Sequence, residues 1–173
     1  MAYLTHADLE FSPVQVEDFD DLITLRNDPS TWSSLTDPLP LSREKQQDWL
    51  RSTNTSRDRF YWSVRSKTEG FVGVVRMDEY APLHRNIRIG ADVVPRLRGR
   101  GYGKQIYEAV IAWCFGQLNV HRIWLLVLDT NARGQALYSK MGFQAEGKMR
   151  QAIWRDGAWR DYVMMSLLEG DRR

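Results

Sequence analysis

The apolar residues recur along the chain with two periods, which predict strands and helices in a mixed order. Short runs rich in branched and aromatic residues predict strands, and apolar positions three or four residues apart predict amphipathic helices. We expect strands at residues 9–16, 60–64, 71–77, 86–94, 122–128, from 143 onward and at 162–168. We expect helices that begin near residues 16, 42, 104 and 131. This order is typical of an α/β domain built on one central sheet.

Local signals predict where several of these elements end. Asn27-Asp28-Pro29 ends the first helix, because the residue before a proline disfavours the helical region. Residues 30–41 are rich in Ser, Thr and Pro and predict a loop, and Ser42 is the expected N-cap of the second helix. Gly142 ends the last helix, and Asp156-Gly157 predicts the turn of a hairpin.

The segment from Pro95 to Lys104 joins a predicted strand to a predicted helix and carries the clearest chemical signal. Its glycines, Gly99, Gly101 and Gly103, expose backbone N–H groups where the helix begins. Such groups lack intrahelical partners and carry partial positive charge, so they form an anion site. Positive side chains surround them: Arg96, Arg98, Arg100 and Lys104. The segment therefore predicts a cradle for a pyrophosphate, although a glycine-rich turn that only joins strand to helix stays open on this segment alone.

Two familiar phosphate loops are excluded by counting. A dinucleotide fingerprint requires Gly-x-Gly-x-x-Gly, and counting from Gly99 places Lys104 at the last position. A Walker A loop requires a glycine where Arg98 stands and a Ser or Thr where Gln105 stands. The pattern that remains is Arg98-x-x-Gly101-x-Gly103.

Composition narrows the classes of protein further. With 173 residues, 43% hydrophobic and 27% charged, the chain fits one domain over residues 1–173. A net charge of +2 is too small to argue for nucleic acid, and there is no apolar run long enough for a membrane span. Cys114 is the single cysteine, which excludes an internal disulfide and fits a cytoplasmic protein. The three histidines have no metal-ligand spacing, so we expect no metal.

Two motifs resemble those of the GCN5-related N-acetyltransferase (GNAT) family. The pattern at residues 98–103 resembles its acetyl-CoA loop. The second motif is Asn131-x-x-Gly134-x-Ala136-Leu137-Tyr138-x-Lys140-x-Gly142-Phe143, which resembles a signature that follows the loop in that family. The segment Leu25-Arg26-Asn27-Asp28-Pro29 resembles the ribosomal-protein (RimJ/RimL-type) branch and related amino-sugar acetyltransferases. The resemblance implies a three-layer α/β (α+β) fold with a mixed, mostly antiparallel sheet of about six to seven strands and about four helices.

The same resemblance implies a function and the residues that perform it. The expected activity is direct transfer of acetyl from acetyl-CoA to a primary amine in a ternary complex. Val93 and Val94 would offer backbone groups to the pantetheine arm, and Asn131 would hydrogen-bond the same arm. Tyr138 would protonate the departing thiolate. The pyrophosphate would lie against the loop residues Arg98, Gly99, Arg100, Gly101, Tyr102, Gly103 and Lys104.

The general base departs from the common pattern of the family, because Arg88 and Leu126 occupy the places where relatives often carry Glu. Asp92 and Glu79 are the candidates, with a water-relayed proton path or a plain Asp92–arginine pair as alternatives. Taking the proton from a lysine amine at pH 7 costs roughly 4.6 kcal/mol, against roughly 1.1 kcal/mol for an α-amine. A site without a strong base therefore favours a protein N-terminus or an amino sugar.

Several readings of the acceptor stay open. It is a peptide N-terminus or a small molecule such as an amino sugar, a polyamine or an antibiotic. An alternative function of a different class is that of a non-catalytic sensor that binds acyl-CoA. Neither nucleic acid nor membrane is an expected partner, and a homodimer is compatible with the branch. Tryptophans are the expected acceptor contacts: Trp32, Trp49, Trp154 and Trp159.

Overall fold

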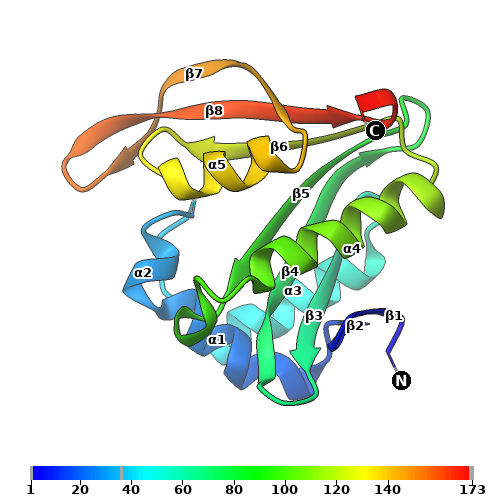
Figure 1. The fold of residues 1–173 in the computed structure, drawn as a ribbon. Helices are drawn as coiled ribbons and strands as arrows, with labels where there is room; N and C mark the ends of the chain where they lie inside the picture. The colour runs from blue at the N-terminus through cyan, green and yellow to red at the C-terminus, as the bar shows by residue number, and fades with distance from the viewer. Residues whose placement is uncertain (1, 36, 172–173) are drawn as a thin grey trace.

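The computed structural model describes residues 2–35 and 37–171, which form an eight-stranded sheet covered by helices (Figure 1). The sheet order is β1-β2-β3-β4-β5-β6-β8-β7. The strands are β1 (Leu4–His6), β2 (Leu9–Pro13), β3 (Phe60–Ser66), β4 (Gly70–Ala81), β5 (Asn86–Val93), β6 (Arg122–Leu128), β7 (Gln144–Arg155) and β8 (Ala158–Leu168). The helices are α1 (Phe19–Asn27), α2 (Pro29–Trp32), α3 (Arg43–Thr55), α4 (Tyr102–Gly116) and α5 (Ala132–Lys140). The predicted fold class is confirmed, with β1 as an added edge strand.

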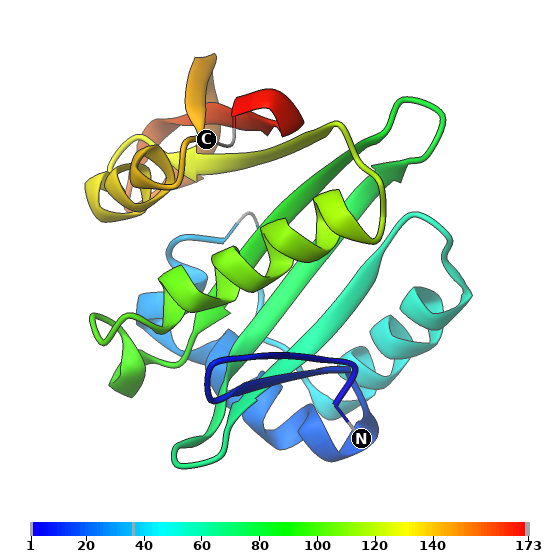
Figure 2. The same ribbon diagram turned by 45° about the vertical axis from the view of Figure 1, so that its right-hand side comes forward.

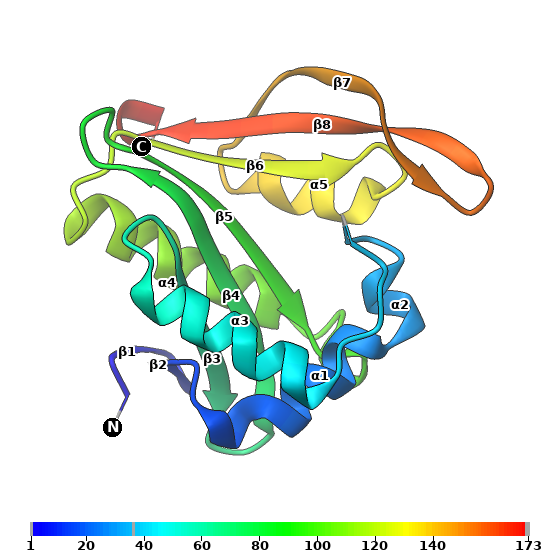
Figure 3. The same cartoon turned by 180° about the vertical axis from the view of Figure 1, so that it is seen from behind.

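The helices lie on both faces of the sheet and make three layers. The apolar side of α4 packs on one face, where Ile106 and Val110 join a core with Ile87 and Ile89 of β5. Figure 2 shows α4 running diagonally across this face. Helices α1 and α3 cover the other face, as Figure 3 shows from behind. There Leu22 and Leu25 pack with Phe71 and with neighbouring β-strand residues.

The sheet divides between β5 and β6. These two strands are parallel, whereas the other described neighbours pair antiparallel. Their pairing covers only Asn86 to Arg88 of β5 against Arg122 to Trp124 of β6. The remainder of β5 pairs with β4 alone, and the remainder of β6 pairs with β8. The two strands therefore diverge, as Figure 1 shows, and leave a gap in the backbone ladder.

Most local signals are confirmed. The side chain of Ser42 accepts a hydrogen bond from the Lys45 amide (3.3 Å), as an N-cap should. Gly142 follows α5 with φ of +94°, and the Asp156-Gly157 turn joins β7 to β8. A single 3₁₀ turn, Val16–Asp18, precedes α1.

The loop expected at residues 30–41 is partly wrong, because the short helix α2 begins at Pro29 and extends to Trp32. Residue 36 lies outside the described residues. The Asp28 carboxylate accepts from the Ser30 amide at 2.9 Å, and Pro29 occupies the first helical position. Both features favour a helix start, and they outweigh the polar composition of the segment. Within the described residues, no helix is both long and apolar enough to cross a membrane.

Candidate functional site

The loop between β5 and α4 presents the start of a long helix to solvent. A 3₁₀ turn, Pro95–Leu97, follows β5, and Gly101 then caps α4 with φ of +91°. Gly99 also has a positive φ of +85°, a region that side chains with a Cβ rarely adopt. The amides of the first turn of α4 point away from the helix and lack an intrahelical acceptor. This helix start is therefore the expected anion site.

A cavity of about 490 Å³ lies between this loop and the start of α5, and we call it the loop groove. One wall comprises Gly99, Gly101, Gly103 and Lys104, and the other comprises Asn131, Arg133, Gly134, Leu137 and Tyr138. The two motifs are 27 residues apart between Lys104 and Asn131, and the fold brings them together across the groove. The groove has the size of an ordinary small-molecule site.

The cationic side chains of the loop are engaged with protein partners. Arg98 uses all three guanidinium nitrogens: Nε donates to the Val93 carbonyl (2.9 Å), Nη1 to Ser30 Oγ (2.7 Å) and Nη2 to Thr31 Oγ1 (2.5 Å). Arg98 therefore fastens α2 to the loop. Arg96 and Arg100 both bind the carboxylate of Glu69, and Lys104 pairs with Glu108. The backbone amides are consequently the better candidates for direct anion contact.

The predicted contacts of Val93, Val94 and Asn131 with the pantetheine arm remain predictions. The three residues occupy different surroundings in the structure. Val93 lines the loop groove, whereas the Val94 amide donates to the Val72 carbonyl (2.9 Å) inside the fold. Asn131 lines the groove and also caps α5, since its Oδ1 accepts from the Gly134 amide at 2.9 Å.

Beyond the point where β5 and β6 diverge, a second cavity of about 100 Å³ lies in the gap between the two strands; we call it the sheet opening. It lies between residues 89–92 of β5 and residues 125–128 of β6. It shares Asp92, Tyr107, Asn131 and Tyr138 with the loop groove. The loop groove and the sheet opening therefore adjoin at these residues.

Tyr138 lies where the groove meets the opening. Its hydroxyl is 3.2 Å from that of Tyr107 on α4. Burial raises the pKa of both phenols, so both stay protonated near neutral pH. Tyr138 is thus a hydroxyl that can donate a proton at the junction, as its predicted role requires. Sequence reasoning missed Tyr107 and Arg133, which also line the loop groove; Arg133 occupies a position that the second motif leaves unspecified.

The candidate bases occupy different places. Asp92 lines the groove and the opening, and its Oδ2 lies 3.1 Å from Nη1 of Arg76. Gly90 leaves room for this pair, because a Cβ there would lie 3.0 Å from the Arg76 guanidinium. Glu79 is more than half exposed, pairs with Arg88 at 3.0 Å and lines none of the described cavities. The structure therefore brings Asp92, but not Glu79, together with Tyr138.

A third cavity, the helix-face pocket, lies on the opposite face of the sheet. Its volume is about 310 Å³, and it reaches the sheet opening through the shared residues Leu35, Arg76 and Asp92. Apolar walls come from α1, α3 and the strands: Leu22, Leu25, Leu41, Trp49, Tyr61 and Val74. Of the predicted tryptophan contacts, Trp49 lines this pocket, while Trp154 and Trp159 lie exposed on the β7–β8 hairpin. Among the described residues no His, Cys, Asp or Glu cluster could hold a metal ion.

Comparison of this sequence with known proteins identifies a matching domain family and several related proteins. The acetyltransferase (GNAT) domain family matches residues 8–144. An uncharacterised N-acetyltransferase, YoaA of Bacillus subtilis, is 28% identical over 109 residues, and the spermidine N(1)-acetyltransferase of Vibrio cholerae is 26% identical over 106 residues. These matches cover 62% and 61% of this chain, and equal shares of the two relatives' own lengths. A ribosomal-protein uS5 alanine N-acetyltransferase of Escherichia coli is 28% identical over 83 residues, 48% of this chain and 43% of that protein.

Solved structures share the same fold. Spermidine N-acetyltransferase from Vibrio cholerae, in complex with CoA and spermine, superposes with a TM-score of 0.90 at 21% identity. The match covers 95% of this chain and 97% of that chain. The relatives include both spermidine and ribosomal-protein acetyltransferases, so they do not single out the RimJ/RimL-type branch that residues 25–29 predict.

Proposed function

This chain belongs to the GNAT acetyltransferase domain family, and on that premise we propose that it transfers the acetyl group of acetyl-CoA to a primary amine. The observation that carries the proposal is that the sheet opening shares lining residues with the loop groove on one face and with the helix-face pocket on the other. Two ligands that approach from opposite faces can meet there, beside Tyr138 and Asp92.

At the level of the family, the comparisons confirm the predicted enzyme class, an N-acyltransferase, and its co-substrate, acetyl-CoA. The activity of this particular chain is our proposal, since the first two curated relatives match over only about three fifths of their length. We also propose a single catalytic domain over residues 1–173 and a cytoplasmic location, for which the one buried thiol of Cys114 is suited.

Acetyl-CoA supplies a thioester whose acetyl group is ready for transfer to nitrogen. The residues of this chain fit it: the first-turn amides of α4 would hold its diphosphate, and Val93 and Asn131 would line the path of its pantetheine arm. The sheet opening would admit the acetyl group. Attack of the amine nitrogen forms the C–N bond and breaks the C–S bond, and the Tyr138 hydroxyl donates its proton to the departing sulfur.

Asp92 would hold and orient the incoming amine. Among the described residues that line the sheet opening, Asp92 carries the only carboxylate, and Arg76 already pairs with it. The proton of the amine then leaves through Asp92 or through water. This arrangement favours an acceptor that loses its proton easily, such as an α-amine, over a lysine side chain. Polyamine acetylation, which the printed names of relatives suggest, is the alternative within the same chemistry.

The direct test measures CoA release with a thiol reagent over a panel of amines that includes peptides with free N-termini, amino sugars and spermidine. The protein contributes little background, because Cys114 is fully buried and burial raises its pKa to about 12. We expect turnover with at least one amine. Tight CoA binding without turnover on the whole panel would instead identify a non-catalytic acyl-CoA sensor.

A further inference from the structure

The walls of the helix-face pocket are apolar and aromatic. Trp49 of α3 and Tyr61 of β3 form one wall, where their rings meet edge to face with centroids 4.7 Å apart. Both residues are only partly buried, so apolar ring surface borders the pocket. The other apolar lining residues are Leu22, Leu25, Leu35, Leu41 and Val74. These walls favour an apolar occupant, because its binding removes apolar surface from water on both sides.

The charged residues of the pocket are paired with one another. Asp92 Oδ2 lies 3.1 Å from Arg76 Nη1. Asp37 Oδ2 lies 3.9 Å from Arg26 Nη2, and Asp37 Oδ1 accepts from the Leu39 amide at 2.9 Å. Two carboxylates and two guanidinium groups therefore leave the described lining residues without net charge. The second ammonium group of a polyamine would find no unengaged carboxylate among them.

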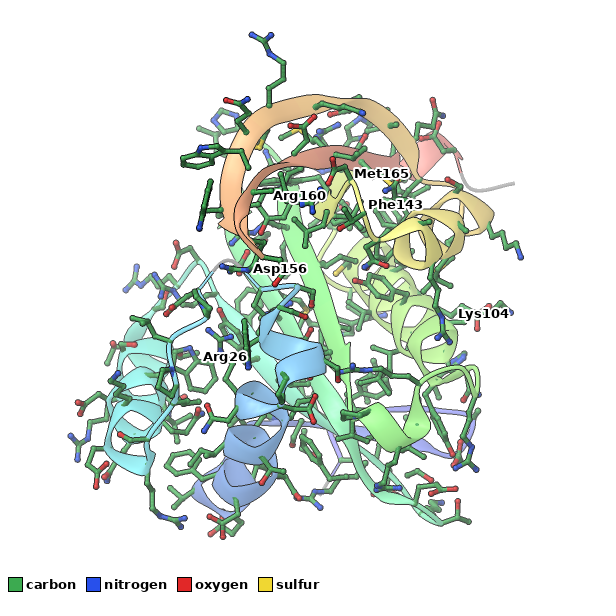
Figure 4. All side chains as sticks on the ribbon, turned by 90° about the vertical axis from the view of Figure 1, so that its left-hand side faces the viewer. Arg26, Lys104, Phe143, Asp156, Arg160 and Met165 are labelled. Atoms are coloured by element: carbon green, nitrogen blue, oxygen red, sulfur yellow. The ribbon has the colours of Figure 1, made fainter. Side chains whose placement is uncertain are left out.

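One carboxylate oxygen is left for a single amine. Oδ1 of Asp92 has neither a hydrogen bond nor an ion pair with the described residues. Asp92 also borders the sheet opening, which Tyr138 lines. Figure 4 shows Arg26, another lining residue of the pocket, on the opposite side of the strands from Lys104 of the loop groove. An amine held by Asp92 would thus lie at the reaction point, while its attached group lies along the apolar walls of the same pocket.

The volume of the pocket limits the size of that group. About 310 Å³ is at the lower end of the range for small-molecule sites, roughly 300 to 1,000 Å³. A single aromatic ring with its amine is compact enough for such a volume.

We propose that the acceptor is a primary amine that carries a compact apolar group, such as one aromatic ring, and no second cation. The inference rests on the proposed function and names the class of its acceptor. The amine binds Asp92, and the apolar group packs against Trp49 and Tyr61. Polyamines and amino sugars are poor acceptors, because the rest of each molecule is charged or polar.

Matched compounds test the proposal without any variant. Phenylalaninamide and glycinamide both carry an α-amine and differ in the aromatic ring, and phenethylamine and ethylamine differ in the same way. Amidated tripeptides that begin with Phe or with Gly extend the comparison to polypeptide N-termini. Spermidine and glucosamine represent the polyamines and the amino sugars. We expect kcat/KM, measured by CoA release, to be at least about tenfold higher for the aromatic members, as burial of an aromatic side chain predicts.

The same compounds distinguish two sources of such an amine. A preference confined to the tripeptides assigns the apolar group to the first residue of a polypeptide. A preference shared by the free amines assigns it to a small molecule. Both results support the proposal.

A variant that fills the pocket assigns the preference to it. Leu41 lines the pocket, and the side chain of Asn27 fixes its backbone by bonding to the Leu41 amide (2.8 Å) and carbonyl (2.9 Å). Leu41→Trp should lower kcat/KM at least about tenfold for phenylalaninamide and less than about threefold for glycinamide. Leu39→Trp is the matched control and should change neither, since Leu39 is 62% exposed and lines none of the described cavities. CoA binding by calorimetry reports that each variant is folded.

The outcomes distinguish this inference from the proposed function. CoA release with spermidine, glucosamine or ethylamine as fast as with the aromatic amines would overturn the inference and leave the proposed function standing. An equal loss for phenylalaninamide and glycinamide in Leu41→Trp would do the same. No CoA release with any amine would overturn the proposed function. In that case calorimetry of phenethylamine and ethylamine with the CoA-loaded protein still decides, because equal binding, or no binding of phenethylamine, overturns the inference.

Discussion

The hydroxyl of Tyr138 on α5 meets the hydroxyl of Tyr107 on α4 at 3.2 Å, and their rings pack edge to face. The pair lines both the loop groove and the sheet opening, at their junction. Tyr107 therefore fixes the direction of the hydroxyl that we assign as proton donor. A positioning role for Tyr107 follows from this contact.

Replacing Tyr138 with Phe should lower kcat about a hundredfold, because general-acid help to a leaving group is typically worth that much. CoA affinity should be unchanged, since the ring and its packing remain. Tyr107→Phe is the comparison: loss of one neutral hydrogen bond should lower kcat by only about two- to tenfold. Steady-state kinetics with calorimetry measure both, and equal rates for wild type and Tyr138→Phe would remove Tyr138 from the mechanism.

Gly101→Val should abolish or strongly weaken CoA binding. The position has φ of +91°, where a residue with a side chain costs about 1 to 3 kcal/mol, and the strain falls on the helix cap that presents the anion site. Gly157→Val provides the control, because Gly157 has φ of +73° in the distant β7–β8 turn. Calorimetric titration with CoA should show the loss for Gly101→Val alone. Normal CoA affinity in a folded Gly101→Val protein would refute the loop assignment.

The Arg76–Asp92 pair should contribute to stability as well as to the site. Both groups are largely buried, with 32% and 16% of the side chains exposed, and their charged atoms lie 3.1 Å apart. A double-mutant cycle with Arg76→Gln and Asp92→Asn should give a coupling of about 0.5 to 3 kcal/mol in urea unfolding. The exposed pair Arg51–Asp48 is the control and should give a coupling near zero. Equal coupling in the two cycles would contradict the special status of the site pair.

Glu146 should make the free energy of unfolding decrease as the pH falls into the acidic range. Hydrogen bonds from Arg122 and then Ser166 lower its pKa from about 4.5 to about 2. A carboxylate with a depressed folded-state pKa stabilises the fold above its unfolded pKa, and that contribution fades as pH falls from about 4.5 toward 2. Urea unfolding from pH 7 to pH 3 should show the decline, and Glu146→Gln should remove part of it. An identical pH profile for the variant would contradict the assignment.

Local signals were sufficient for most of the elements, although not for β1 or α2, and for much of the loop groove. The glycines at 99 and 101, the cap at Ser42 and the stop at Gly142 depend on backbone preferences of a few neighbouring residues, which the sequence displays directly. Contacts between segments far apart in the chain could not be predicted from these local signals. Arg98 binds Ser30 across 68 positions, and the pairing of Arg88 with Trp124 ends where the strands diverge. Such contacts depend on the register of separate elements, which no local pattern specifies.

The acceptor side of the site shows the same limit. An Asp92–arginine pair was among the alternatives predicted from the sequence, but Arg76, which lies on the neighbouring strand β4, was not identified as the partner. The short helix α2 was missed because the effect of its cap outweighs composition.

The divergence of β5 from β6 gives the molecule two separate entrances. On the proposed function, a nucleotide-bearing ligand would enter beside α4 and a second, smaller ligand would enter beneath α1 and α3, so neither would have to pass the other. We therefore expect the two ligands to bind in either order, and each product to leave on the side from which its precursor came.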